Sequence, residues 1–469
     1  MKNKKIRKTV IVICWLVIWQ ILAVVVDNSI LVVGPWEAAG ALWHSLGNTD
    51  FWHIVGLSLL RIGSGFLGAF VAGVLLGSLS FRIPVLEEIL APVTAVCKTV
   101  PVASFVVLLL IWAGSEYVAV VICFLVTFPN IYFSVMAGLR SAPKDLLEMA
   151  WVFRTGRFKK ICQIYRPAVE PYLENSLKVT LGMSWKSGVA AEVIGIPAFS
   201  LGERLYTSKI YLDTASLFAW TFVIILLSLL FEKVFLFLFH QIAGTQGLIK
   251  GITGPGQEKR KGNKPELNSA QKGQEITVRH LTKKFGEQTV FEDLTRDLRK
   301  SEIYCIMGPS GVGKTTLLRI LAGLDTAEAG NITGLKKATT GFAFQEDRLL
   351  ENLSAVENVQ FAAGVNREYA MAELEQVISR DSLEKKTSEL SGGMKRRVSV
   401  VRAMAAGGEL VVLDEPFAGL DRTNKVILAE YIRRRQRGRT LLVTTHDESD
   451  LELLQGIRWD IQGKKTGIL

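Results

Sequence analysis

The sequence predicts an all-α membrane domain of six spanning helices, followed by an α/β domain with a largely parallel sheet. Long apolar runs recur through the first 240 or so residues, and short β-rich runs alternate with helical segments after Ile276. At 49% hydrophobic residues, the 469-residue chain is too apolar for an ordinary soluble protein. We therefore expect a membrane domain at 1–243, a flexible Gly- and Lys-rich linker at 244–275, and the α/β domain at 276–469.

Each of the six apolar runs is near the ~20 residues that a bilayer core requires. The first follows a basic N-terminus, and no small-residue cleavage site comes after it, so we interpret it as a spanning helix rather than a signal peptide. In the second, Gly65, Ala69, Gly73 and Gly77 recur every four residues, which predicts close packing against a neighbouring helix. The predicted spans are Val10–Val26, Gly56–Ser80, Ile89–Trp112, Tyr117–Leu139, Asn175–Pro197 and Ser216–Phe239.

The charges indicate which loops face the cytoplasm. The loop between the fourth and fifth spans, about 145–172, is strongly basic, whereas the segment between the fifth and sixth has only Arg204 and Lys209. The net charge of +11 is explained by basic residues beside apolar runs, so we expect a lipid bilayer and no nucleic acid as partner. The five cysteines are scattered without CxxC spacing, which favours core thiols over a disulfide framework or a zinc site.

A phosphate-binding loop opens the α/β domain. The apolar strand 303–307 leads into Gly308-Pro309-Ser310-Gly311-Val312-Gly313-Lys314-Thr315-Thr316 and then into a helical run. The glycines let backbone N–H groups of this loop surround phosphates at a helix N-terminus. Lys314 is placed to reach the β- and γ-phosphates, and the Thr315 hydroxyl to bind Mg²⁺. The motif therefore predicts a site for ATP with Mg²⁺, lined by Gly308, Ser310, Gly311, Gly313, Lys314, Thr315 and Thr316.

A second apolar strand, 410–413, ends in Asp414 and Glu415. Alone, such a pair is usually a turn at a strand end. In a P-loop domain we expect Asp414 to support the metal and Glu415 to act as the general base toward water.

Three further motifs follow the order typical of one family. Ser391-Gly392-Gly393 opens a helix, for which a simple helix cap is the alternative reading, and Gly419-Leu420-Asp421 and Thr445-His446-Asp447 come later. With the P-loop and Asp414-Glu415, this order resembles the ATP-binding cassette ATPases over nearly all of 276–469. The resemblance implies an α/β P-loop NTPase that hydrolyses ATP.

The resemblance also implies roles that single residues would not. Phe285 stands where the family stacks an aromatic ring on adenine, Gln345 where it contacts Mg²⁺ and the water, and His446 where it senses the γ-phosphate. Singly, these three would be a core ring, a solvated amide and a structural histidine. Ser391, Gly392 and Gly393 are implied to contact ATP held by a second ATPase domain, so that two copies close face to face.

The membrane half resembles the permeases of bacterial importers for sulfonates, taurine, nitrate and related solutes. The cytoplasmic stretch Glu148-Met149-Ala150, with Gly156 and Ile164-Tyr165-Arg166-Pro167, resembles their coupling loop, which docks in a groove of the ATPase; an amphipathic cytoplasmic helix is the alternative. Other similar stretches are Gly34-Pro35, Ser58-Leu59-Leu60-Arg61, Lys98-Thr99-Val100-Pro101 and Ala191-Glu192.

The fifth span carries Lys178, Lys186 and Glu192, which are costly against lipid. We expect them to face the bundle interior or a partner subunit, making this helix a candidate wall of the pathway; a structural ion pair or snorkelling is the alternative.

Taken together, the sequence indicates a multi-pass protein of the bacterial cell membrane with a cytoplasmic ATPase domain. The resemblance implies a homodimer with two permease and two ATPase units, supplied by an extracytoplasmic solute-binding protein. An exporter or lipid translocator is the first alternative, although that family has longer cytoplasmic helix extensions. A membrane-tethered regulatory ATPase is the second.

Overall fold

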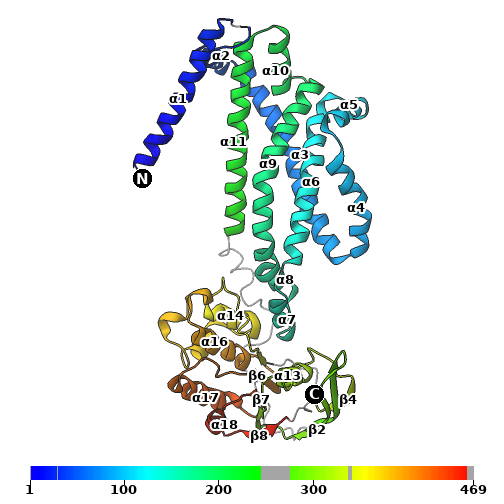
Figure 1. The fold of residues 1–469 in the computed structure, drawn as a ribbon, viewed down its shortest axis with the longest axis vertical. Helices are drawn as coiled ribbons and strands as arrows, with labels where there is room; N and C mark the ends of the chain where they lie inside the picture. The colour runs from blue at the N-terminus through cyan, green and yellow to red at the C-terminus, as the bar shows by residue number, and fades with distance from the viewer. Residues whose placement is uncertain (1, 29, 245–274, 336–340, 462–469) are drawn as a thin grey trace, which may run out of the picture. The chain divides into compact units, whose positions relative to one another are not determined.

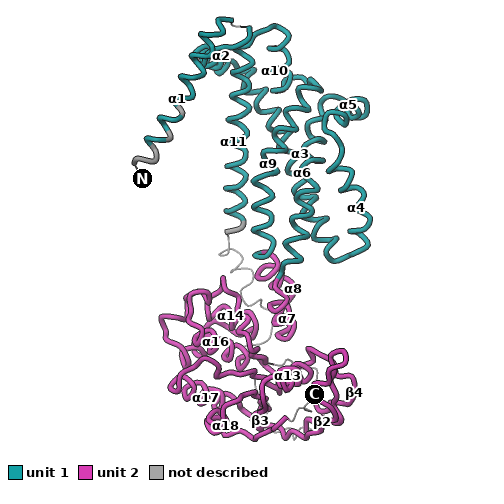
Figure 2. The backbone as a smooth tube through the Cα atoms, in the orientation of Figure 1, with its two compact units in different colours: residues 1–142, 167–246 teal, residues 143–166, 247–469 magenta. Residues whose placement is uncertain are grey.

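The computed structural model describes residues 2–28, 30–244, 275–335 and 341–461 (Figure 1). The chain divides into two compact units, residues 1–142 with 167–246 and residues 143–166 with 247–469 (Figure 2). Part of the predicted membrane domain, 143–166, thus groups with the second unit. The predicted linker falls on residues outside the described ranges, apart from its two end residues.

The first unit is all-helical. Four of its helices are long and apolar enough to cross a membrane: α1, α3, α6 and α11. The helix α9 covers the predicted fifth span, but it carries Lys178, Lys186 and Glu192 and is not in that apolar set. The helices of this unit are α1 (Lys2–Val26), α2 (Pro35–Leu46), α3 (Thr49–Arg82), α4 (Pro84–Thr99), α5 (Val102–Ala113), α6 (Ser115–Arg140), α9 (Arg166–Gly195), α10 (Leu201–Ile210) and α11 (Thr214–Gly244).

The predicted span Ile89–Trp112 falls on two helices rather than on one continuous helix. The chain forms α4 and α5 there. Only taken together are these two helices long and apolar enough to cross a membrane, and they meet at a bend of 108°. Between them, Val100 and Pro101 have extended backbone, with ψ of 123° and 124°. Pro101 has no N–H to donate and disfavours helical backbone at Val100. Among the described residues, four helices are long and apolar enough to cross a membrane, or five spans if the bent pair counts as one.

Close packing of α3 on α6 confirms the stripe of small residues. A Cβ atom added to Gly65 would lie 2.3 Å from the carbonyl oxygen of Val120, and one on Gly73 would lie 2.8 Å from a methyl carbon of Ile131. Larger side chains at these positions would force the helices apart. Beside this contact, Phe66, Phe231 and Phe235 pack edge to face and join α3 to α11.

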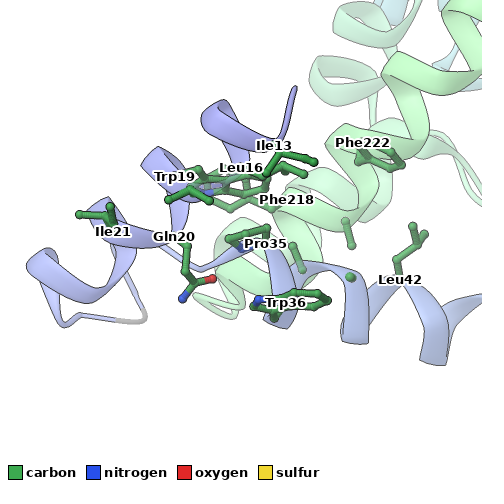
Figure 3. A pocket seen from close by; sticks show the side chains of 14 residues that line it. Ile13, Leu16, Trp19, Gln20, Ile21, Pro35, Trp36, Leu42, Phe218 and Phe222 are labelled. Atoms are coloured by element: carbon green, nitrogen blue, oxygen red, sulfur yellow. The ribbon is translucent and has the colours of Figure 1, made fainter. Parts of the chain in front are cut away.

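An apolar hollow of about 600 Å³ lies between α1, α2 and α11 (Figure 3). Trp19, Trp36 and Phe218 are among the side chains that line it, together with the amide of Gln20. None of the described residues around it is charged. Its lining therefore offers little to hold a polar or ionic solute.

The second unit is α/β, as predicted. Its main sheet is parallel, in the order β5-β6-β7-β3-β8, and a second, antiparallel sheet has the order β2-β1-β4. The strands are β1 (Ile276–Phe285), β2 (Gln288–Leu298), β3 (Ile303–Met307), β4 (Ala329–Thr333), β5 (Gly341–Ala343), β6 (Leu410–Asp414), β7 (Thr440–Thr444) and β8 (Ile457–Asp460). The helices are α7 (Lys144–Val152), α8 (Arg157–Lys160), α13 (Lys314–Leu321), α14 (Ala355–Ala363), α15 (Arg367–Leu374), α16 (Gly392–Ala405), α17 (Arg422–Gln436) and α18 (Glu448–Leu454).

Each face of the parallel sheet supports its own hydrophobic core, because side chains alternate along a strand. Tyr304 and Ile306 of β3 pack with α13, whereas Ile303 and Cys305 pack with α14, α16 and α17. Thus α13 and α16 cover opposite faces of the sheet. The carboxyl ends of β3, β5, β6 and β7 meet at one edge, where the predicted site residues follow the strands.

Candidate functional site

The P-loop connects the buried strand β3 to α13. Gly311 and Gly313 have positive φ of 80° and 99°, which L side chains rarely adopt. At Gly313 an added Cβ would also lie 2.3 Å from a methyl carbon of Val290. Glycine is therefore required at position 313 on both grounds, and the loop turns tightly into the N-terminus of α13, where N–H groups can face an anion.

Lys314 begins α13, and its side chain is almost fully buried. The ammonium Nζ donates hydrogen bonds to the carbonyl oxygens of Gly308 at 2.7 Å and Pro309 at 3.1 Å. These contacts hold the positive charge inside the curve of the loop. Ser310 and Gly311 at its tip are exposed.

The two predicted carboxylates end the buried strand β6, next to β7. The Thr444 hydroxyl donates to Oδ1 of Asp414 at 2.5 Å and accepts from the backbone N–H of Glu415 at 2.9 Å. Burial raises the pKa of Asp414, and the hydroxyls of Thr444 and Thr315 oppose this shift. The Oδ2 atom of Asp414 is buried and has no hydrogen-bond partner among the described residues. Glu415 itself has a positive φ of 50°.

The structure brings His446 to Glu415. Nδ1 of His446 lies 4.0 Å from Oε1 of Glu415, and the imidazole is largely exposed. The loop that carries His446 is fixed on both sides: the Thr445 hydroxyl donates to Asp450 at 2.6 Å, and the Lys425 ammonium bonds Asp447 at 2.8 Å. Lys425 also bonds Asp450 at 2.8 Å. Hydrogen bonds from Lys425 and Ser449 hold the pKa of Asp447 far below its ordinary value.

Gln345 follows β5, which pairs in parallel with β6, so it reaches the same sheet edge as Asp414. Its side chain is exposed. The described contact of Gln345 is through its backbone: the guanidinium of Arg396 donates to the carbonyl oxygens of Phe344, at 2.7 Å, and of Gln345. The structure thus brings this residue to the site edge without a described contact from its amide to Asp414 or Thr315.

Phe285 ends β1, and its ring is 54% exposed. The ammonium of Lys283 lies 4.9 Å from the ring centroid, and it is fixed by Asp325, by Glu328 and by the carbonyl oxygen of Thr326. An exposed aromatic ring at a sheet end can stack on a nucleotide base.

The predicted signature residues lie elsewhere. Ser391 caps α16, where its hydroxyl accepts from the N–H of Met394 at 3.4 Å, and Gly392 and Gly393 form the first turn. This is the alternative reading of a helix cap, and it leaves the signature surface exposed. Because α16 and α13 cover opposite faces of the sheet, Ser391, Gly392 and Gly393 are not brought to the P-loop of the same chain.

The segment 143–166 packs within the second unit beside this site. Met149, Ala150, Val152, Phe153 and Ile164 join the hydrophobic core that contains α13. Glu148 of α7 bonds Arg319 of α13 and Arg348, which follows Gln345 closely in the chain. Although burial opposes it, hydrogen bonds from these two guanidinium groups hold the pKa of Glu148 below its ordinary value.

Two stretches of the chain match models of known families. Residues 291–418 match the family described as "ABC transporter", and residues 66–243 match "Binding-protein-dependent transport system inner membrane component". Residues 291–418 are thus similar to the ATPase domains of ABC transporters, and residues 66–243 to the membrane components of binding-protein-dependent transport systems. With this similarity and its long apolar helices, the chain is a multi-pass membrane protein.

Two curated relatives illustrate the similarity of the ATPase domain. The sulfate/thiosulfate import ATP-binding protein CysA of Xanthomonas campestris pv. campestris is 37% identical over 201 residues, which is 38% of this chain and 59% of the relative. CysA of Burkholderia mallei is 35% identical over 205 residues, 39% of this chain and 58% of the relative. The chain thus spans somewhat more than half the length of these relatives.

Solved structures of ATP-binding cassettes also match. The cassette MJ0796 in a dimeric post-hydrolysis state with ADP and Pi is 25% identical, with a TM-score of 0.37, over 40% of this chain and 94% of that chain. A further dimeric structure of MJ0796 is 26% identical, with a TM-score of 0.36, over 39% and 94% of the two chains.

Sequence reasoning missed three residues that shape the site. Thr444 links Asp414 to Glu415, Lys425 fixes the loop of His446, and Arg396 holds the backbone beside Gln345. Thr444 could have been found, because it ends a predicted strand directly before Thr445-His446. Lys425 and Arg396 lie on helices, and no local pattern indicates that their side chains reach those loops.

Proposed function

We propose that the protein is half of an ATP-driven importer that brings a small anionic or polar solute into the cell, such as a sulfonate, taurine, nitrate or sulfate. The observation that carries the proposal is the P-loop, Asp414, Glu415 and His446 at one sheet edge, in a chain that also holds a binding-protein-dependent permease domain. The names of the relatives support a solute with oxygen-bearing anionic groups.

Magnesium ion fits the residues at this edge. Mg²⁺ favours oxygen ligands, and the buried, unpartnered Oδ2 of Asp414 lies near the Thr315 hydroxyl. Thr315, Asp414 and Gln345 would hold the ion, which when bound would neutralise charge on the phosphates. In this proposal Lys314 binds the phosphates, Phe285 stacks on adenine, Glu415 accepts the proton of the attacking water, and His446 contacts the γ-phosphate.

The cassette domain is proposed to be 276–469, with a permease domain at 1–243 and a linker between them. Within 1–243, the coupling loop of about 145–172 carries movements of the cassette to the permease. The ion pairs of Glu148 support this role, because Arg319 lies on the P-loop helix and Arg348 lies three residues after Gln345. A change at either nucleotide-binding element is thereby linked to α7.

The proposed transporter contains two copies of the chain. Ser391, Gly392 and Gly393 are exposed or partly exposed at the start of α16, on the sheet face opposite α13. We propose that they contact ATP on the P-loop of a second copy, in a homodimer of two permease and two ATPase units. A separate extracytoplasmic binding protein delivers the solute, and the permease match supports import over export.

Substitution of Glu415 tests this proposal. Glu415→Gln removes the proton acceptor, so ATP hydrolysis and solute uptake should both fall about 10²-fold or more while ATP still binds. The assay is ATPase activity and uptake by proteoliposomes of the full chain, with binding proteins loaded with sulfate, taurine or nitrate. Glu409→Gln is the matched control: Glu409 precedes the same strand β6, is exposed and is bonded to Lys300, and both activities should persist.

The result also separates the alternatives. Loss of hydrolysis with unchanged uptake would contradict an ATP-driven transporter and favour a regulatory ATPase. Stimulation of hydrolysis by hydrophobic compounds, and by none of the loaded binding proteins, would contradict import and favour export.

A further inference from the structure

A hollow of about 430 Å³, lined by both polar and apolar side chains, lies between α6 and α9 within the first unit. On α6 it is lined by Asn130, Phe133 and Ser134, and on α9 by Tyr172, Asn175 and further residues. The α6 residues share one helix face by their spacing of three and four. The volume is within the roughly 300–1,000 Å³ of small-molecule sites.

This hollow is unlike its surroundings. Against hydrocarbon, exposed amide and hydroxyl groups are costly, and irregular or polar surfaces inside a membrane normally face protein or a water-filled path. Asn175 and Tyr172 are both exposed on α9. Tyr172 ends the predicted cytoplasmic loop and Asn175 begins the predicted fifth span, so both polar groups lie where water or a solute can reach them.

A lysine lies beside the hollow. The ammonium of Lys98 is 3.8 Å from the ring centroid of Phe133, one of the lining residues. Lys98 is the residue before the last of α4, which ends at Thr99 just before the break at Val100 and Pro101. The described residues provide it with no carboxylate partner. A second lysine, Lys186, is exposed on α9 seven residues beyond Val179, on the same helix face.

The side chains that line the hollow favour an anion over a cation. Among the described residues that line the hollow, none is acidic. Several hydroxyls already donate to backbone carbonyls, as Ser134 does to Asn130 at 2.8 Å and Thr180 does to Ser176 at 2.7 Å. The Asn175 amide and the Tyr172 hydroxyl have no hydrogen-bond partner among the described residues, so their N–H and O–H groups remain free to donate.

We infer that the hollow between α6 and α9 is a binding site for a small oxyanion on the translocation pathway. Lys98 supplies the positive charge, and Asn175 and Tyr172 donate hydrogen bonds to the anionic oxygens. The inference rests on the proposed import of an anionic solute and specifies where the permease holds it. The site has few polar groups and is open, so it should bind the anion weakly. Weak binding suits a transport pathway, because the solute must leave the site again.

The experiment measures access and charge directly. In the full chain in proteoliposomes without ATP, Asn175→Cys is treated with a negatively charged and a positively charged methanethiosulfonate reagent. Mass spectrometry of the peptide holding residue 175 gives the rate ratio. We expect the anionic reagent to react faster, and Lys98→Met to lower the ratio about tenfold, since a focused positive charge raises the local concentration of anions.

Matched variants and competing solutes complete the test. Lys98→Arg should keep the ratio, because it retains the positive charge beside Phe133. Sulfate, taurine or nitrate should slow the labelling, and mannitol should not. An unchanged ratio in Lys98→Met, no protection by any of the three anions, or no labelling of residue 175 by either reagent would each overturn the inference.

The labelling does not depend on ATP hydrolysis, so its failure differs from failure of the proposed function. If Glu415→Gln lowers ATP-driven uptake but Lys98→Met leaves the labelling ratio unchanged, the proposed import is supported and the oxyanion site is contradicted. If Lys98→Met lowers the labelling ratio but no ATP-driven uptake is measured, the oxyanion site is supported and ATP-driven import is contradicted.

Discussion

Arg396 fixes the backbone beside Gln345, and the strength of this contact can be measured. Its buried guanidinium donates to the carbonyl oxygens of Phe344 and Gln345 and lies 3.3 Å from Oδ1 of Asp347. Arg396→Gln should release this segment, because hydrogen bonds from a charged group each contribute about 1.5–3 kcal/mol. Amide hydrogen exchange of 344–348 should speed up about thirtyfold, equivalent to about 2 kcal/mol of local opening.

Two variants distinguish the guanidinium contact from charge alone. Arg396→Lys keeps the charge but lacks the planar pair of donors, so it should restore only part of the protection. Lys395→Gln removes a neighbouring charge whose side chain is only partly buried, and exchange should not change. Equal exchange in Arg396→Gln and the parent chain would show that other contacts hold this segment.

The positions of some predicted site residues follow directly from the strands that carry them. Asp414, Glu415 and His446 follow β6 and β7, and adjacent parallel strands bring their carboxyl ends together, so order along the chain was enough to predict that they meet. Arg396 and Lys425 could not be predicted in this way. Each acts through a long side chain that reaches another element, and that reach depends on tertiary packing.

Among the elements, α7 connects to nucleotide-binding parts of the second unit through Glu148. Its carboxylate bonds Arg319 and Arg348, and all three side chains are partly buried. In Glu148→Gln the charge is lost but the shape is kept, so we expect basal ATP hydrolysis to persist while uptake per ATP hydrolysed falls several-fold. Uptake and hydrolysis by the same proteoliposomes give that ratio.

Asp145→Asn provides the control for this element. Asp145 lies one turn before Glu148 and pairs with Arg348 at 3.2 Å, but it is largely exposed, and exposed ion pairs contribute little. Its ratio of uptake to hydrolysis should match that of the parent chain. A Glu148→Gln chain that transports as efficiently as the parent would contradict the coupling role of α7.

Among the predicted spans, the break between α4 and α5 shows why composition does not fix helix boundaries. The run Ile89–Trp112 is apolar enough for one span, and Pro101 was a possible sign of a break. Proline alone does not decide, however, because Pro92, Pro129 and Pro171 lie inside α4, α6 and α9 without ending them. Whether neighbouring helices can satisfy the freed carbonyl groups is a tertiary property that sequence reasoning does not reach.

At the scale of the whole molecule, the parallel sheet separates the P-loop helix α13 from α16, which begins at the predicted signature residues. Ser310 lies at the P-loop tip before α13, and Ser391 begins α16 on the other face. Both side chains are exposed. Ser310 and Ser391 thus belong to elements on opposite faces of the sheet, and we expect ATP to bridge them between two chains that face each other.

Disulfide trapping between two chains tests this arrangement. We expect a chain with Ser310→Cys and a chain with Ser391→Cys, both carrying Glu415→Gln to retain ATP, to cross-link when co-expressed and oxidised with ATP present. A product of twice the chain mass, absent without ATP and absent when either substitution is made alone, would support face-to-face closure. The parent chain controls for its five native cysteines. Cross-linking that is independent of ATP would contradict the two-copy arrangement. So would a disulfide that forms only within one chain, in a variant that carries both Ser310→Cys and Ser391→Cys.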